Sequence, residues 1–309
     1  MLSYAFKRLL GAVPTLLLLV TLAFFLMRAA PGGPFDRERA LPPQIEQTLR
    51  AEYHLDEPLV RQYLHYLGGL TRGDLGPSFQ YQGFRVAELI GSGAPVSFRL
   101  GACAILLAVL LGGALGCAAA LRRNSAADRM LMALAMFGIS LPSYVVAPLL
   151  ILLFAVTLNW LPAGGWSRHG VADAVLPVVT LALPQIAAVA RLARASLIEV
   201  LGAPFIRTAR AKGLPLRLIV WRHALKPAAL PLLSYLGPAA AAIVTGSVVV
   251  EQVFGIPGIG RYFVQAALNR DYTLVLGVVL FYGALIILFN FIVDLLYGVL
   301  DPRVRLGES

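Results

Sequence analysis

Hydrophobic residues fall into long runs without charged side chains, and polar segments separate these runs. A helix of about 20 apolar residues crosses the hydrocarbon core of a bilayer, which is about 30 Å thick. Six runs are candidates for such spans: residues 9–27, 100–121, 131–158, 174–190, 227–250 and 272–293. The fourth run is short and contains two prolines, so we expect its helix to continue past Arg191. The pattern predicts an all-α, polytopic membrane protein with about six spans.

Composition and charge agree with a membrane protein. Of the 309 residues, 59% are hydrophobic and 14% are charged, whereas about 25% of a soluble domain is charged. The net charge of +10 does not indicate nucleic acid, because the basic residues are sorted by loop. If the N-terminus is inside, the inner segments 1–8, 122–130, 191–226 and 301–309 hold 15 of the 26 lysines and arginines. This positive-inside bias predicts that both termini lie in the cytoplasm.

The chain divides into four parts. Residues 1–29 begin with Lys7 and Arg8 and an apolar run, but no small-x-small cleavage site follows, so we expect a retained membrane anchor. Residues 30–96 form an extracytoplasmic segment. Residues 97–300 form the transmembrane core, and residues 301–309 form a cytoplasmic tail.

The extracytoplasmic segment is polar and mixed in charge. Helical periodicity appears at residues 44–53 and 58–70, with Asp56 as a candidate N-cap of the second helix. We expect both helices to lie on the membrane surface. Four aromatic residues either form a belt at the membrane interface or contact a partner or substrate: Tyr63, Tyr66, Phe79 and Tyr81.

Prolines and glycines are frequent inside the predicted spans. A proline removes a backbone donor and kinks its helix, and a membrane tolerates this where neighbouring helices or a water-filled cavity satisfy the freed carbonyls. The third, fourth and fifth candidate spans each contain at least two prolines. This favours a transport pathway over a passive anchor. Gly112, Gly113 and Gly116 are small enough for close helix packing.

The loop 191–226 contains eight basic residues and a single acid, Glu199. Its start continues the fourth span in helical register until a Gly-Ala pair breaks the run. Pro204 then stands where a helix tolerates proline, and Gly213 stands where a helix ends. These residues predict a short helix over 204–212, about 13 Å long, followed by a turn and a further helix that leads into the fifth span.

The faces of this short helix allow two interpretations. Phe205, Ile206 and Ala209 share an apolar side. Its other sides carry the basic residues Arg207, Arg210 and Lys212. The helix either rests on anionic lipid headgroups or inserts into a groove of a cytoplasmic partner.

Motifs along nearly the whole chain resemble those of ABC importer permeases, in the variant that belongs to peptide permeases. The loop carries Arg207-Thr-Ala-Arg-Ala-Lys-Gly213 and Arg222-His-Ala-Leu-Lys-Pro227, which are similar to the EAA loop of that family. Other matching motifs are Gly73-Asp-Leu-Gly-Pro-Ser-Phe79, Leu161-Pro-Ala-Gly-Gly-Trp166, Gly255-Ile-Pro-Gly-Ile-Gly260 and Ala267-Leu-Asn-Arg-Asp-Tyr272. Arg207 replaces the glutamate that names the loop, so a salt bridge from that glutamate is not expected here.

The resemblance implies the transmembrane domain of a type I importer in the bacterial inner membrane, with peptides as cargo. The implied partners are a second homologous permease subunit, two ABC ATPase subunits and a periplasmic or lipid-anchored peptide-binding protein. It assigns coupling to the ATPase to Pro204, Phe205, Ile206, Arg207, Thr208, Ala209, Arg210, Ala211, Lys212 and Gly213. The candidates for facing the binding protein or the pathway are Glu251, Gly255, Pro257, Gly258, Asn269, Arg270 and Asp271. A plainer interpretation of Glu251 is that it faces interfacial water or pairs with Arg261.

Energy must come from another subunit if transport is driven by ATP. None of the lysines Lys7, Lys212 and Lys226 is followed by Ser or Thr, so the chain has no Walker A motif, and ATP and Mg²⁺ would bind the partner ATPases.

The alternative class of transporter is an ion-coupled carrier, although no carboxylate stands in mid-span. A membrane enzyme is disfavoured because HExxH and GxSxG are absent. Cysteine and histidine spacings give no metal site. The same machinery carrying a nickel chelate or a peptide antibiotic stays open.

Overall fold

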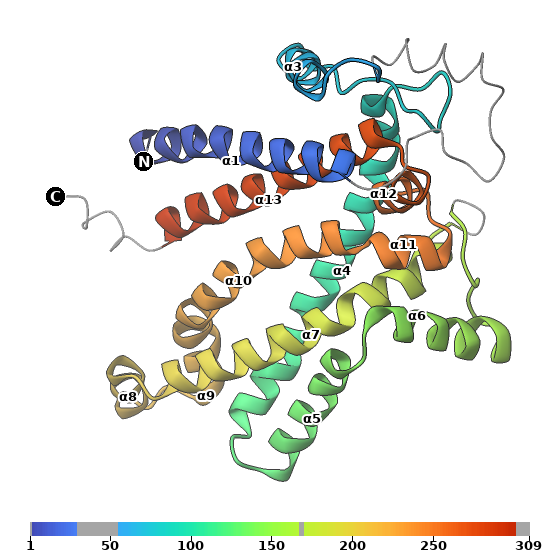
Figure 1. Cartoon of the computed structure of the whole chain (residues 1–309). Helices are drawn as coiled ribbons and strands as arrows, with labels where there is room; N and C mark the ends of the chain where they lie inside the picture. The colour runs from blue at the N-terminus through green and yellow to red at the C-terminus, as the bar shows by residue number, and fades with distance from the viewer. Residues whose placement is uncertain (1, 30–54, 167–169, 301–309) are drawn as a thin grey trace.

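The computed structural model describes residues 2–29, 55–166 and 170–300, and the regular elements in these ranges are helices (Figure 1). Five helices in the described ranges are long and apolar enough to cross a membrane: Leu10–Ala29 of α1 (Leu2–Ala29), α4 (Val86–Leu121), α7 (Ala172–Leu201), Leu216–Gly246, and Tyr272–Val293 of α13 (Tyr272–Leu300). The fourth of these comprises α9 (Leu216–Leu218), a π-helical segment (Ile219–Ala224) and α10 (Leu225–Gly246). The prediction of an all-α, polytopic chain is confirmed. So is the extension of the fourth run past Arg191, because α7 ends at Leu201.

The third predicted span is bent and is not the single run expected over residues 131–158. α5 (Ala126–Ser140) and α6 (Ser143–Leu150), which continues as a π-helical segment (Ile151–Thr157), meet at 101°. Leu141 between them is extended, with φ −105° and ψ 123°, because the ring of the following proline disfavours helical backbone at the preceding residue. Counted together, α5 and α6 form a sixth candidate span.

Two glycines of α4 let it approach α7, which lies between α10 and α5 in Figure 1. A Cβ on Gly112 would lie 2.6 Å from the carbonyl oxygen of Ile186, and one on Gly116 would lie 2.4 Å from that of Ala190. Both positions therefore require glycine for close packing, as predicted. Gly113 differs, since a Cβ there would meet no atom within 4 Å.

The short helix α3 (Leu59–Leu70) packs against α1. The hydroxyl groups of Thr21 and Tyr63 lie 2.6 Å apart, and the ring of Phe24 contacts the rings of Tyr63 and Tyr66 at centroid distances of 5.2 and 6.2 Å. These tyrosines thus stabilise the contact with α1. Pro58 is the N-cap of α3, so the prediction of Asp56 as its cap is wrong. The helix predicted over residues 44–53 lies outside the described residues.

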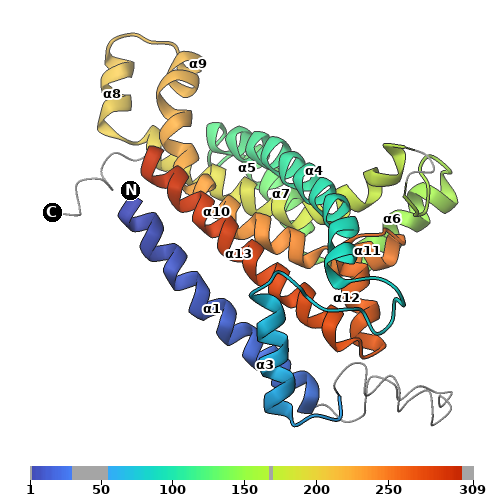
Figure 2. The ribbon, with the colours of Figure 1, turned by 90° about the horizontal axis from the view of Figure 1, so that it is seen from above.

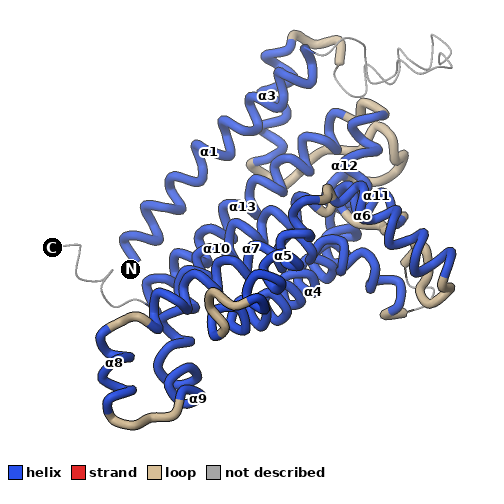
Figure 3. The backbone as a smooth tube through the Cα atoms, turned by 90° about the horizontal axis from the view of Figure 1, so that it is seen from below, coloured by secondary structure: helices blue, strands red, loops and turns tan. Residues whose placement is uncertain are grey.

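The molecule has two distinct ends. α8 (Pro204–Ala211) and α9 lie at one end, on the same side as the N-terminal end of α1 and the C-terminal end of α13 (Figures 1 and 3). α3, α11 (Val248–Phe254) and α12 (Ile259–Leu268) lie at the other end (Figure 2). We call these the α8 end and the α12 end. The outer ends of the first and last described helices, at Leu2 and Leu300, therefore lie on the side of the α8 loop. The assignment of that side, and of both termini, to the cytoplasm stays a prediction.

Candidate functional site

The helix α8 is fixed at both of its ends by local backbone geometry. Pro204 occupies its first turn, after Ala203 in extended conformation, and proline is preformed for that position. At the other end, Gly213 has φ +77°, its N–H donates to the Arg210 carbonyl at 2.9 Å, and the Leu214 N–H reaches the Ala209 carbonyl at 3.3 Å. These two bonds form a Schellman motif, which satisfies the last carbonyls of a helix. The predicted helix over 204–212 is confirmed to within one residue.

One side of α8 is buried within the chain itself. Ile206 is fully buried and Ala209 is 8% exposed, in a cluster with Leu197 of α7 and Ile219 of the π-helical segment. The prediction that Ile206 shares an outward apolar side with Phe205 is therefore wrong. Neighbouring residues of a helix point about 100° apart, and here the inward direction belongs to Ile206.

The other side of α8 is open. Phe205 is 49% exposed. The remaining exposed positions are Pro204, Arg207, Thr208, Arg210, Ala211, Lys212 and Gly213. The hydroxyl of Thr208 donates to the carbonyl of Pro204 at 3.2 Å, within the helix. α8 thus presents an aromatic ring and several cations on a support that is packed against α7.

An ion pair braces the α8 end of the molecule. Arg194 of α7 donates from Nε and Nη2 to the two carboxylate oxygens of Asp128 in α5, at 2.6 and 2.7 Å. The Asn124 N–H also reaches Asp128, at 2.9 Å, and Ser125 caps the helix by accepting the Asp128 N–H at 3.1 Å. Sequence reasoning did not identify this pair. The feature of the sequence that could have indicated it is the Ser-x-x-Asp cap pattern of Ser125 and Asp128, in a short loop whose other charged residues are basic.

Glu251 of α11 is fully buried at the α12 end. Its carboxylate accepts hydrogen bonds from the hydroxyls of Ser97 and Ser247, both at 2.7 Å, and from the Gly260 N–H at 2.7 Å. Arg261 offers its backbone N–H, at 3.4 Å. The expectation that Glu251 faces interfacial water or pairs with the Arg261 side chain is therefore wrong. A buried carboxylate with these donors joins helices and is unavailable to a passing ligand.

The motif of residues 255–260 wraps around this carboxylate. Gly255 ends α11 in the left-handed region, with φ 65°. A Cβ on Gly258 would lie 2.3 Å from the carboxylate of Glu251, and one on Gly260 would lie 2.4 Å from the Cα of Val248. Gly258 is buried, whereas Pro257 is half-exposed and Gly255 is exposed.

Asp271 forms a second buried anchor at the same end. One of its carboxylate oxygens accepts the Leu274 N–H at 3.0 Å and caps α13, and the other accepts the Ser78 hydroxyl at 2.5 Å. It thereby ties the loop before α4 to the start of α13. The preceding residues differ: Asn269 is exposed, and Arg270 is half-exposed with φ 56°.

A tyrosine near this anchor links the same loop to α12. The hydroxyl of Tyr81 donates to the side-chain oxygen of Gln265. A tyrosine phenol is neutral at physiological pH, and burial raises the pKa of the Tyr81 phenol further. In the described part of the chain, no group of three or more His, Cys, Asp or Glu residues is placed to hold a metal ion.

These features define a polytopic helical membrane protein. A bundle of spans, with a bend of 101° between α5 and α6, carries a packed, cationic helix at one end and a braced loop cluster at the other. Two family models match the sequence: "Binding-protein-dependent transport system inner membrane component" over residues 112–306, and the corresponding N-terminal model over residues 1–84. The chain belongs to the family of binding-protein-dependent inner membrane components and is a permease subunit of an ABC transporter.

Full-length relatives agree with the family. The oligopeptide transport system permease protein OppB of Salmonella typhimurium is 54% identical over 305 residues, which are 99% of this chain and 100% of the relative. The dipeptide transport system permease protein DppB of Bacillus subtilis is 45% identical over the full length of both chains. The expected resemblance to peptide permeases is confirmed.

One solved structure shares the fold. The MetNI methionine ABC transporter, in inward facing conformations, matches with a TM-score of 0.56 at 19% identity, over 70% of this chain and 97% of that chain. At this identity the likeness concerns the fold alone.

Proposed function

We propose that this chain is the pore-forming permease subunit of an ATP-driven importer of peptides, either oligopeptides or dipeptides. The support is the agreement over full length with permeases named for oligopeptide and dipeptide transport. The partners in this proposal are a second homologous permease subunit, two ATPase subunits that bind ATP and Mg²⁺, and a peptide-binding protein on the outer side.

The observation that carries the coupling role is the division of α8 into a buried and an open side. Ile206 fixes α8 to α7 and to the π-helical segment, so a force on α8 moves the spans with it. Phe205, Arg207 and Lys212 are exposed on the open side, where a groove of an ATPase subunit is expected to bind. Aromatic and arginine side chains are the common anchors of such interfaces.

The α12 end is proposed to face the binding protein. Asn269 and Gly255 are exposed there and Pro257 and Arg270 are half-exposed, so these residues are the candidates for direct contact. Glu251, Gly258 and Asp271 are buried and are assigned a positioning role, in which they hold the exposed residues in place. This divides the seven candidate residues into two groups with different expected effects.

Identification of the co-purified ligand tests the cargo. The complex with its binding protein is purified under native conditions, and the ligand released on denaturation is identified by mass spectrometry. Peptides are the expected result, whereas a nickel chelate or a peptide antibiotic would replace the peptide assignment and leave the permease assignment intact.

Uptake into proteoliposomes tests the energy source, and it is measured with an uncoupler or with a non-hydrolysable ATP analogue. Loss of uptake with the uncoupler alone would indicate an ion-coupled carrier and would refute the proposal.

A further inference from the structure

An apolar groove of about 610 Å³ runs along the spans at the α8 end. It lies between α4, α7 and the helix from α9 to α10, and its lining includes Val109, Gly113, Leu121, Leu197, Val220 and Leu232. On α4 the lining extends from Val109 to Leu121, a rise of about 18 Å. One leaflet of a bilayer has about 15 Å of hydrocarbon. The groove therefore matches the length of a lipid acyl chain in one leaflet.

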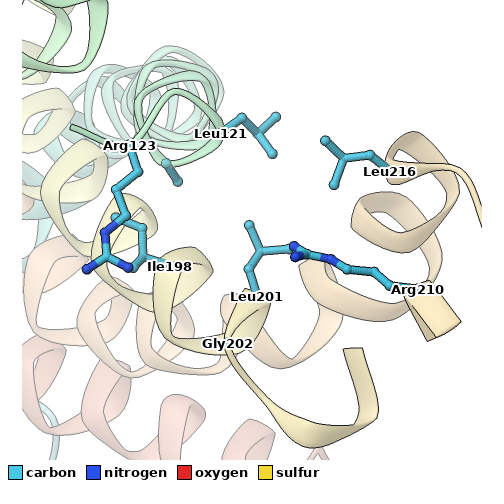
Figure 4. A pocket seen from close by; sticks show the side chains of 8 residues that line it. Leu121, Arg123, Ile198, Leu201, Gly202, Arg210 and Leu216 are labelled. Atoms are coloured by element: carbon cyan, nitrogen blue, oxygen red, sulfur yellow. The ribbon is translucent and has the colours of Figure 1, made fainter. Parts of the chain in front are cut away.

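The groove ends at a basic pocket of about 300 Å³ (Figure 4). Arg123, just after α4, and Arg210 of α8 reach into this pocket from opposite sides, and Leu201 and Gly202 at the end of α7 form its base. Both arginines are exposed, and neither has an ion pair with another residue in the described ranges. Leu121 lines both the groove and the pocket, so the two adjoin at this side chain.

We propose that an anionic phospholipid occupies this groove, with an acyl chain along α4 and α10 and its phosphate between Arg123 and Arg210. Basic pockets between membrane helices on the cytoplasmic side suit anionic headgroups. Trp221, which is 70% exposed, borders the groove near this end, and tryptophan is typical of the headgroup level. Because Arg210 belongs to α8, the bound lipid contacts the helix assigned to coupling. The proposal rests on the predicted cytoplasmic position of the α8 end and, for that last point, on the proposed function.

Other occupants fit less well. A peptide needs partners for its backbone N–H and C=O groups, and the side chains that line the groove are aliphatic or small, apart from Cys117 and Trp221. A helix of the second permease subunit would fill the apolar part but would leave the two arginines without an anion. A lipid with a phosphate headgroup satisfies both parts at once.

Native mass spectrometry of the assembled complex tests the proposal. The complex is delipidated in detergent and titrated with phosphatidylglycerol or with phosphatidylcholine of the same acyl chains. We expect the wild-type complex to retain phosphatidylglycerol. The double variant Arg123→Gln, Arg210→Gln should bind this lipid on the order of 30-fold more weakly than the wild type. The matched control is Arg122→Gln, Arg207→Gln, which removes two exposed arginines from the same segments outside the pocket. Equal retention in the two double variants would overturn the proposal.

A second pair of variants tests the acyl chain. Gly113→Leu fills the groove, whereas Gly91→Leu adds the same side chain on α4 outside it, and neither Cβ meets an atom within 4 Å. Retention should fall in Gly113→Leu alone. Phosphatidylglycerol with a photoreactive acyl chain should label residues of α4 and α10. If a helix of the second subunit fills the groove, the adducts will map only outside it. That result would refute the proposal that a lipid occupies the groove. The readout is lipid retention, so peptide uptake can fail or persist independently.

Discussion

The hydroxyl of Ser97 in α4 donates a 2.7 Å hydrogen bond to the buried carboxylate of Glu251 in α11. The oxygen of the same hydroxyl accepts the Ile259 N–H, at the start of α12, at 3.0 Å. One small side chain therefore joins three helices at the α12 end. A buried carboxylate depends on each of its donors, since a lost hydrogen bond to a buried charge is not replaced by bulk solvent.

Removal of this hydroxyl should destabilise the α12 end. We expect Ser97→Ala to lower the free energy of unfolding by about 1–3 kcal/mol, because the carboxylate of Glu251 loses one donor and the Ile259 N–H loses its acceptor. The measurement is the thermal unfolding of the purified complex in detergent. Ser234→Ala is the control, because the Ser234 hydroxyl donates only within its own helix, to the Leu230 carbonyl at 3.2 Å. Equal melting temperatures for the two variants would contradict the assigned role.

The contact between α4 and α7 can be tested with two glycines of one helix. Gly116→Ala places a Cβ 2.4 Å from the Ala190 carbonyl oxygen, so α4 and α7 must separate, at a cost of about 1–3 kcal/mol. Gly113→Ala meets open space and should leave stability unchanged or raise it by up to about 1 kcal/mol, since alanine favours the helix. Both variants are compared by denaturant unfolding. A Gly113→Ala variant as unstable as Gly116→Ala would contradict the packing account, because alanine favours the helix at both positions and only Gly116 lies against α7.

Local features of the sequence were sufficient to predict α8 but not its orientation. Its ends are set by Pro204 and Gly213, whose backbone preferences hold in any surroundings. Which face of α8 points inward depends on its packing against α7 and the π-helical segment. A helical projection of residues 204–212 contains no information on those neighbours. Ile206 was therefore assigned to the outside together with Phe205, and only the packing shows that it points inward.

The position of Glu251 shows a second limit of sequence reasoning. A carboxylate at the end of an apolar run is expected at the interface, because burial of a charge is costly. Its partner Ser97 stands 154 residues earlier, and no local pattern pairs the two. A partial signal was present: Ser247 precedes Glu251 by four residues and lies on the same face of a helix, and the glycines at 258 and 260 indicate a close backbone approach.

The ion pair between Asp128 and Arg194 should brace α5 against α7. Asp128→Asn and Arg194→Gln should each lower the melting temperature, because each leaves a charged partner with its hydrogen bonds broken. The exchange Asp128→Arg, Arg194→Asp restores opposite charges and should recover part of the loss seen in its own single variants, Asp128→Arg and Arg194→Asp. A double-mutant cycle over these three variants measures the coupling. Arg191→Gln is the control for Arg194→Gln, since it removes an exposed arginine from the same helix. Additive effects would mean that the two side chains do not interact.

The two adjacent apolar residues of α8 should separate stability from coupling. Ile206→Ala leaves a cavity in the cluster around Leu197 and should lower the free energy of unfolding by about 2–5 kcal/mol. Phe205→Ala removes a ring that is 49% exposed, so stability should change by less than about 0.5 kcal/mol, whereas peptide uptake per ATP hydrolysed should fall. Phe84→Ala serves as the control for an exposed phenylalanine at the α12 end. Uptake and ATP hydrolysis are measured together in proteoliposomes. If Phe205→Ala keeps the wild-type ratio of uptake to hydrolysis while Ile206→Ala unfolds the subunit, α8 stabilises the fold and the docking surface lies elsewhere.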